Sequence, residues 1–241
     1  MFDHVTIRVS NRAASERFYD MLLRTLERDG ARSGDEYTEW DDFSLAEATI
    51  DKPVTRRLHV GFTAPTREHV RAFWQAGVDA GYASDGEPGP RLQYREDYYG
   101  AFLLDPDGNS AEAVHYGSVH ERGGIDHLWI RVTDLAASKR FYEAVAPYTG
   151  FGPRAEAPGR SHFGGARSSF AIVSGTATEH LHMAFPANDD ATVDAFHAAA
   201  TGLGYRDNGG PGERTIYHPG YYGAFILDPD GNNIEVVNHN R

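Results

Sequence analysis

The sequence predicts an α+β fold built from two tandem copies of one domain. Residues 126–142 (DHLWIRVTDLAASKRFY) repeat residues 3–19 (DHVTIRVSNRAASERFY) at an offset of 123 residues. The same offset relates residues 98–109 to residues 221–232. Such a long internal repeat indicates a duplicated unit. Within each copy, segments with strand periodicity alternate with segments of helical periodicity, which predicts mixed α and β structure.

The first element expected is a strand over residues 4–9, where polar and apolar residues alternate. Its polar residues His4, Thr6 and Arg8 share one face, because successive side chains of a strand point to opposite sides. The apolar residues between them share the other face. We therefore expect that second face to pack under a helix and the polar face to point away from it.

The next elements complete the first βαβββ unit and begin another. A helix is expected over about 11–28, with Ser10 as its N-cap. Short strands are expected over about 35–40 and 43–49. The segment 56–62 also has the composition of a strand and starts the second unit.

The second unit of the first half has the same order of elements. Its helix is expected from Thr66 to Ala80, and a loop rich in Gly and Pro follows at 86–90. Its last three strands are expected over residues 91–95, 99–104 and 110–115. A DPDGN turn joins the last two strands as a hairpin. Each copy is thus βαβββ–βαβββ, and the chain carries four such units.

Length and composition bound the class of protein. The 241 residues divide into a first domain at 1–117, a linker at 118–124 and a second domain at 125–241. A hydrophobic share of 40% and a charged share of 24% are typical of a globular protein. A net charge of −12 argues against nucleic-acid binding. We expect no signal peptide and no membrane span, and the lack of cysteine fits a cytoplasmic protein without disulfides.

Three polar positions carry the same potential metal ligand in both copies. They are His4 and His127, His59 and His182, and Glu112 and Glu235. Two imidazoles and one carboxylate per copy suffice for a divalent metal site with open positions. The alternative explanation is that the duplication copied these histidines and glutamates and that they have no function. The two glutamates argue against it, since burying a carboxylate in a pocket without a partner costs free energy.

These motifs resemble the vicinal oxygen chelate superfamily of glyoxalases, bleomycin-resistance proteins and extradiol dioxygenases. The matching pieces are the DHxxIRV first strand, the LHVGF or LHMAF internal strand and the DPDGNxxE hairpin, and they cover nearly all of both halves. The resemblance implies that paired βαβββ units form a curved open sheet around a cleft. It also implies that the six residues above project into clefts as ligands of Fe(II), Mn(II), Zn(II) or Ni(II).

Two departures from the family pattern bear on the reaction. Glyoxalase I enzymes add a fourth ligand on the last strand of the first unit, where this chain offers only Glu47 in one copy and Ser174 in the other. This makes glutathione-hemithioacetal isomerisation an unfavoured reaction. Extradiol dioxygenases place a tyrosine ten residues before the last ligand, where this chain has Phe102 and Phe225. That difference weakens the case for catechol cleavage.

Two groupings of the six ligands are open. Each half forms its own site, as in extradiol dioxygenases, or the halves exchange ligands, as in glyoxalase-type dimers. We favour the first grouping, which would join His4, His59 and Glu112. The exchanged sets are His4 with His182 and Glu235, and His127 with His59 and Glu112.

The expected function is that of a metal-dependent enzyme acting on a small molecule with vicinal oxygens, as a lyase or isomerase or as a dioxygenase. The alternative is a metal-free, antibiotic-binding protein of the bleomycin-resistance type. Glu112 and Glu235 are also the candidate catalytic groups. The candidate substrate-binding residues are Thr6, Arg8, Tyr98, Phe102, Trp129, Arg131, Tyr221 and Phe225. The chain is expected to act as a monomer with an internal pseudo-dimer or as a homodimer.

Overall fold

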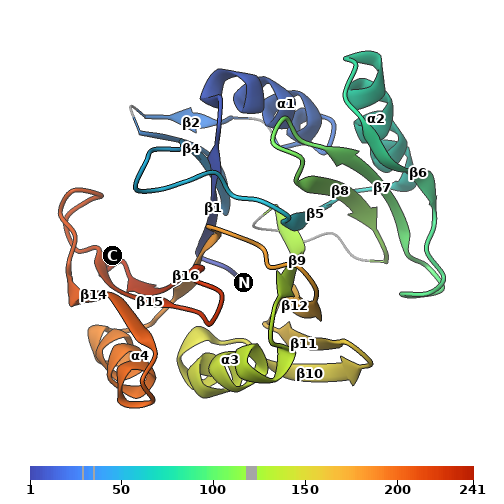
Figure 1. The fold of residues 1–241 in the computed structure, drawn as a ribbon. Coiled ribbons are helices and arrows are strands. Elements are labelled where there is room, and N and C mark those ends of the chain that lie inside the picture. Colours follow the sequence, from blue (N-terminus) through green and yellow to red (C-terminus); the bar gives the residue numbers. More distant parts are fainter. Residues whose placement is uncertain (29, 35, 118–123) are drawn as a thin grey trace. The chain divides into compact units, whose positions relative to one another are not determined.

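The computed structural model describes residues 1–28, 30–34, 36–117 and 124–241, which form four helices and sixteen strands (Figure 1). Their order repeats the βαβββ unit four times, which confirms the predicted α+β fold. None of these helices is long and apolar enough to cross a membrane. The elements are β1 (His4–Val9), α1 (Arg12–Arg24), β2 (Arg32–Ser33), β3 (Tyr37–Trp40), β4 (Phe43–Glu47), β5 (His59–Thr63), α2 (Arg67–Asp79), β6 (Ser84–Pro90), β7 (Tyr99–Leu104), β8 (Ser110–His115), β9 (Ile125–Val132), α3 (Leu135–Thr149), β10 (Gly152–Ala157), β11 (Arg160–Gly164), β12 (Ser169–Ser174), β13 (His182–Pro186), α4 (Asp190–Gly202), β14 (Arg206–Glu213), β15 (Tyr222–Leu227) and β16 (Asn233–Asn238).

Contacts divide the chain into two compact units. Unit 1 contains Met1–Val5 and Ile130–Arg241, and unit 2 contains Thr6–Trp129. Strands β1 and β9 therefore each begin in one unit and end in the other. The domain division at 1–117 and 125–241 stays a prediction, and of its linker only Gly124 is among the described residues.

Unit 2 places β5 between two strands that come from distant parts of the sequence. Its strand orders are β9-β5-β8-β7-β6 and β1-β4-β3-β2. Strand β5 runs parallel to β8, with His59 opposite Ser110, and antiparallel to β9, with Gly61 opposite His127. The histidines of β5 and β9 and the glutamate of β8 thus lie on neighbouring strands.

Unit 1 repeats this arrangement with β13 in the place of β5. Its strand orders are β1-β13-β16-β15-β14 and β9-β12-β11-β10. Strand β13 is parallel to β16, with Ala184 opposite Glu235. The Asp3 N–H donates to the Ala184 carbonyl oxygen at 2.9 Å, which fixes the start of β1 beside β13. His4 thereby comes next to the strand that carries His182.

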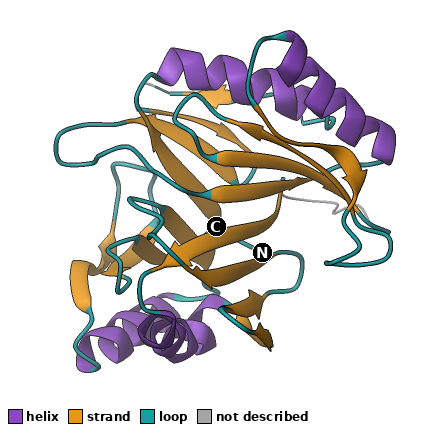
Figure 2. Ribbon diagram, turned by 45° about the vertical axis from the view of Figure 1, so that its right-hand side comes forward, coloured by secondary structure: helices purple, strands orange, loops and turns teal. Residues whose placement is uncertain are grey.

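The helices cover one face of the strands in each unit and bury the core (Figure 2). In unit 2, α1 and α2 pack against each other, and the side chains of Phe18, Leu22 and Phe73 are fully buried. Helix α1 begins one residue later than expected, because Asn11 rather than Ser10 is its N-cap. The polar face of β1 is half-buried and its apolar face fully buried, as the alternation predicted.

Helix α1 ends at Arg24 rather than near residue 28, and strand β2 was not predicted. One further segment of predicted secondary structure is wrong. The expected loop at 86–90 belongs to strand β6, and the expected strand at 91–95 forms turns. Strand β6 pairs with β7 through a register that shifts at Gly86 and Gly89. Glycine and proline are tolerated in an edge strand with bulges, so a composition typical of loops misled the prediction.

Candidate metal centres

Three side chains from three strands of unit 2 converge on one point. The Nε2 atoms of His59 and His127 lie 3.0 Å and 3.2 Å from Glu112 Oε2. The two Nε2 atoms lie 3.2 Å from each other. Glu112 is 1% exposed, so its carboxylate is removed from water and needs these partners.

Unit 1 holds a matching cluster of His4, His182 and Glu235. His182 Nε2 lies 3.0 Å and His4 Nε2 lies 3.6 Å from Glu235 Oε2. The two Nε2 atoms are 3.1 Å apart, and the imidazole rings stack. Glu235 is as deeply buried as its counterpart in unit 2.

The six predicted ligands are therefore all brought together, but in the exchanged grouping. The favoured grouping within each half is wrong, because His4 does not join His59 and Glu112. The reason is strand pairing. Strand β5 lies next to β9, the first strand of the second copy, and β1 lies next to β13.

The donor atoms of the unit 2 cluster fit a divalent metal. In unit 2, His127 Nδ1 is 2.8 Å from Asp126 Oδ2 and must donate its proton there. His59 Nδ1 lies 3.1 Å from Ser110 Oγ, whose own proton goes to a carboxylate, so this nitrogen also donates. The Nε2 lone pairs of both histidines then face Glu112 Oε2. These three acceptor atoms have no hydrogen between them, so a cation is needed to stabilise their contact.

The spacing of these atoms also fits. Metal bonds of about 2.1 Å at right angles place neighbouring ligand atoms roughly 3.0 Å apart, and tetrahedral bonds place them about 3.4 Å apart. The separations in unit 2 are 3.0, 3.2 and 3.2 Å. Two imidazoles and one carboxylate at this spacing leave the opposite side of the metal open.

In the unit 2 cluster, the pKa values of the glutamate and of one histidine depend on each other. Burial opposes ionisation of Glu112, but hydrogen bonds from His127 and His59 outweigh it and lower the pKa of Glu112. Burial also opposes a charge on His127, yet the carboxylates of Asp126 and Glu112 raise the pKa of His127 to about 10. Without a metal, a proton on His127 thus supplies the cation that the cluster requires.

A tyrosine fixes the second oxygen of each glutamate. Tyr98 donates its hydroxyl to Glu112 Oε1 at 2.8 Å, and Tyr221 donates to Glu235 Oε1 at 2.6 Å. Burial and the neighbouring carboxylate raise the pKa of the Tyr98 hydroxyl, so it keeps its proton and remains a donor. Their hydroxyls thus orient the carboxylates toward the histidines, and the prediction that both tyrosines bind substrate stays a prediction.

The acids behind the first histidine of each cluster were not among the predicted site residues. Asp126 accepts from His127, and Asp3 accepts from His4 at 2.8 Å. A carboxylate on Nδ1 fixes the ring and its tautomer so that Nε2 presents a lone pair. The repeated Asp-His pair that starts both copies was the available clue.

Comparison with known proteins places the chain in a family. A family model described as the Glyoxalase/Bleomycin resistance protein/Dioxygenase superfamily matches residues 1–113 and 124–236. The chain belongs to this superfamily. A comparison with functionally curated proteins gave no match.

Solved structures of the superfamily share the fold over the whole chain. Glyoxalase I from Zea mays has a TM-score of 0.70 at 19% identity, over 99% of this chain and 92% of that one. A candidate dioxygenase from Bacillus subtilis has a TM-score of 0.66 at 12% identity, over 100% of this chain and 85% of that one. At these identities the likeness concerns the fold alone.

The remaining predicted substrate-binding residues fall into two groups. Aromatic residues adjoin the clusters: the His59 ring lies 5.8 Å from the Phe102 ring and 6.1 Å from the Trp129 ring, and the His182 ring lies 6.3 Å from the Phe225 ring. The others make contacts elsewhere. Thr6 Oγ1 hydrogen-bonds Ser44 Oγ, Arg8 donates to the Glu47 carbonyl oxygen, and the exposed Arg131 side chain lies against Gly175.

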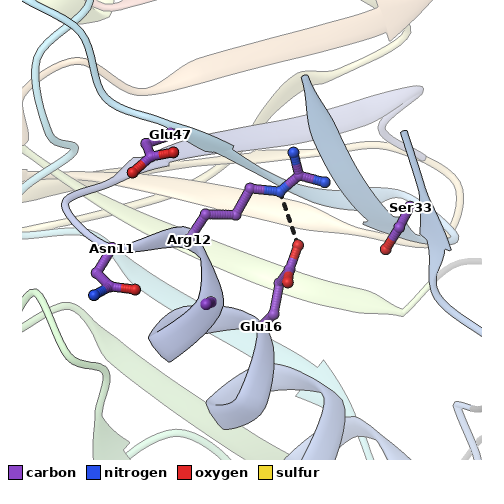
Figure 3. A pocket seen from close by; sticks show the side chains of 6 residues that line it. Asn11, Arg12, Glu16, Ser33 and Glu47 are labelled. Atoms are coloured by element: carbon purple, nitrogen blue, oxygen red, sulfur yellow. Dashed lines mark hydrogen bonds and ion pairs between the residues drawn. The ribbon is translucent and has the colours of Figure 1, made fainter. Parts of the chain in front are cut away.

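The position of the fourth ligand of glyoxalase I holds no member of either cluster. Glu47 ends β4, is exposed and lines an open surface hollow with Arg12 and Glu16 (Figure 3). Arg12 in this hollow donates to Glu16 at 2.8 Å and to backbone carbonyls, so its charge serves local structure. Ser174 ends β12 and is exposed. Each cluster thus offers three side-chain ligands among the described residues.

Proposed function

We propose that the protein is a divalent-metal-dependent enzyme that acts on a small molecule with two adjacent oxygen atoms. One observation carries this proposal: two imidazole nitrogens and one carboxylate oxygen converge at about metal-ligand spacing, and they do so in both units. Superfamily membership supports the same chemistry. Each ligand set comes from a single chain, so neither site needs a second copy of the protein.

The number of ligands favours chelation of the substrate. Three side chains leave several metal positions available, which suits a substrate that binds through two neighbouring oxygens. When bound, the metal would act as a Lewis acid that stabilises an oxyanion or as a site that activates dioxygen. The three-ligand set argues against isomerisation of the glyoxalase I type, which the family resemblance associates with a fourth ligand.

The chain's own residues would orient the ligands and the substrate. Tyr98 holds one oxygen of Glu112, so that the other faces the histidines and the carboxylate acts as a ligand rather than as a mobile base. The rings of Phe102 and Trp129 stand beside His59 and would form the walls against which a flat substrate lies. Such walls exclude water, which strengthens electrostatic interactions at the reacting oxygens.

Metal uptake tests the proposal. We expect about two divalent ions per chain after reconstitution of metal-free protein with Fe(II), Mn(II), Zn(II) or Ni(II), measured by elemental analysis. The double variant His59→Ala with His182→Ala removes one ligand from each cluster and should take up none while it stays folded. His69→Ala with His197→Ala is the matched control, since these histidines pair with surface acids outside the clusters.

A second measurement separates the two reaction classes. A dioxygenase consumes dioxygen when Fe(II)-loaded protein meets a catechol-type substrate, whereas a lyase or isomerase acts on 2-hydroxycarbonyl compounds without oxygen uptake. The proposal would be contradicted if wild-type protein bound none of the four metals. Binding of aromatic, cationic drugs by such metal-free protein would support the antibiotic-binding alternative instead.

A further inference from the structure

The two clusters have identical ligands but differ in the residues behind them. Four positions related by the offset of 123 residues hold different residues in or beside the hydrogen-bond networks of the clusters. The pairs, unit 2 first, are Asp85 and Asn208, Ser110 and Asn233, Arg95 and His218, and Tyr116 and His239. We propose that these differences make the metal site of unit 2 the tighter of the two. This inference rests on the proposed metal-dependent function.

The second histidine of the unit 2 cluster is backed by a carboxylate. Ser110 Oγ donates to Asp85 Oδ2 at 2.7 Å, and its lone pair accepts the proton of His59 Nδ1 at 3.1 Å. This relay keeps the proton of His59 on Nδ1 and leaves the Nε2 lone pair for a metal. A negatively charged partner behind an imidazole also raises its basicity as a ligand.

The equivalent histidine of unit 1 is backed by neutral amides. Asn208 Nδ2 donates to Asn233 Oδ1 at 2.9 Å, so the amide nitrogen of Asn233 faces His182 Nδ1. Neither amide carries a charge, so His182 lacks the carboxylate that stands behind His59.

The first histidine of unit 1 is backed by an acid that also binds a second imidazole. His239 Nε2 lies 2.8 Å from Asp3 Oδ2, His239 Nδ1 lies 2.8 Å from His218 Nε2, and His218 Nδ1 lies 2.7 Å from the Pro219 carbonyl oxygen. The carboxylate of Asp3 is thus shared between His4 and a second imidazole, that of His239.

In unit 2 the corresponding acid has a neutral partner. Asp126 accepts from the hydroxyl of Tyr116. Burial and the carboxylate of Asp126 raise the pKa of Tyr116, so the phenol stays uncharged. Arg95 lies over the Tyr116 ring at 4.7 Å, but its charge is balanced by Asp97, to which it donates through two nitrogens.

The charges joined to each cluster by hydrogen bonds therefore differ. In unit 2 three carboxylates act together, those of Glu112, Asp126 and Asp85. In unit 1 the described residues supply two carboxylates, those of Glu235 and Asp3, and Asp3 also binds His239. A divalent cation is attracted more strongly to the first set, and changes of this kind behind metal ligands alter affinity by about 10–100-fold.

Single-site variants of the full chain measure the two affinities separately. His182→Ala leaves the unit 2 site and His59→Ala leaves the unit 1 site, and each is titrated with Mn(II) by calorimetry. We expect the dissociation constant of the unit 2 site to be lower by at least about tenfold. Asp85→Asn on the His182→Ala background should weaken binding several-fold, and Asp85 is exposed, so the fold will tolerate the change.

The reciprocal change and a control complete the test. Asn208→Asp with Asn233→Ser on the His59→Ala background recreates the relay and should tighten the unit 1 site. Asp79→Asn, which removes an exposed acid of α2 that binds Gln75, should leave the unit 2 site unchanged. Equal affinities, or a tighter unit 1 site, would overturn the inference and leave the metal-dependent function standing. No binding by wild-type protein would overturn both.

Discussion

A methyl group added at Gly61 should displace His127 from the unit 2 cluster. Gly61 lies opposite His127 in the β5–β9 pair, and the ring of His127 lies across it. A Cβ at this position would sit 2.4 Å from Cε1 and 2.6 Å from Nδ1 of that ring. Ordinary carbon contacts need about 3.5 Å, so Gly61→Ala requires the ring to move by roughly 1 Å.

The size of the effect follows from what the movement breaks. The ring loses its 2.8 Å hydrogen bond to Asp126, and Nε2 moves away from Glu112. A charge-assisted bond is worth about 1.5–3 kcal/mol, against a gain of about 0.5–1 kcal/mol when alanine replaces glycine in a strand. We expect the metal-free variant to lose about 1–2 kcal/mol of unfolding free energy and the unit 2 site to bind Mn(II) about 10–100-fold more weakly.

Calorimetric titration on the His182→Ala background, together with urea denaturation, measures both quantities. Gly34→Ala is the control, because a Cβ there meets nothing closer than 3.8 Å. Unchanged Mn(II) affinity in Gly61→Ala protein that is correctly folded would refute the placement of the His127 ring over this glycine.

Three further perturbations address charge and hydrogen bonding. Carboxylate partners raise the pKa of His127 to about 10, so Mn(II) binding in unit 2 at neutral pH should release about one proton. The affinity for Mn(II) should then rise about tenfold per pH unit up to about pH 10. Calorimetry in buffers of different ionisation enthalpy counts the released protons, and a count of zero would contradict this prediction. Burial raises the pKa of Asp42 to about 6, above its unfolded value, so its contribution to the unfolding free energy is fullest below about pH 4 and is lost as the pH rises through about 6. Relative to wild type, Asp42→Asn should gain about 3 kcal/mol between about pH 3 and pH 7 in urea denaturation, and a constant difference would refute this. Tyr98→Phe leaves Glu112 Oε1 without its hydrogen-bond donor and should lower the unfolding free energy of the metal-free protein by about 1–3 kcal/mol. Tyr94→Phe, at an exposed ring, is the control and should change this free energy little. Equal losses in the two variants would contradict the orienting role of Tyr98.

Most of the fold could be predicted from the sequence, because the internal duplication shows which segments are equivalent. Alternation in β1 and helical spacing in α1 agree with the structure, since burial on one face dictates both patterns. The error at β6 arose where an edge strand uses glycine and proline at bulges. Composition there reflects backbone conformation rather than the absence of pairing.

The ligands could be predicted but their grouping could not. His59 and His127 meet because β5 pairs with β9, and periodicity within a segment does not say which distant strand will be its neighbour. The residues behind the ligands were harder still. Asp85 reaches His59 through Ser110, and no spacing rule relates positions 85, 110 and 59.

Anomalous X-ray diffraction from crystals soaked in Mn(II) tests the central claim most directly. Two peaks are predicted, one about 2.1 Å from His59 Nε2, His127 Nε2 and Glu112 Oε2, and the other at the same distances from the set in unit 1. Saturated crystals with manganese only on surface acids, and with neither cluster holding an ion, would contradict the account.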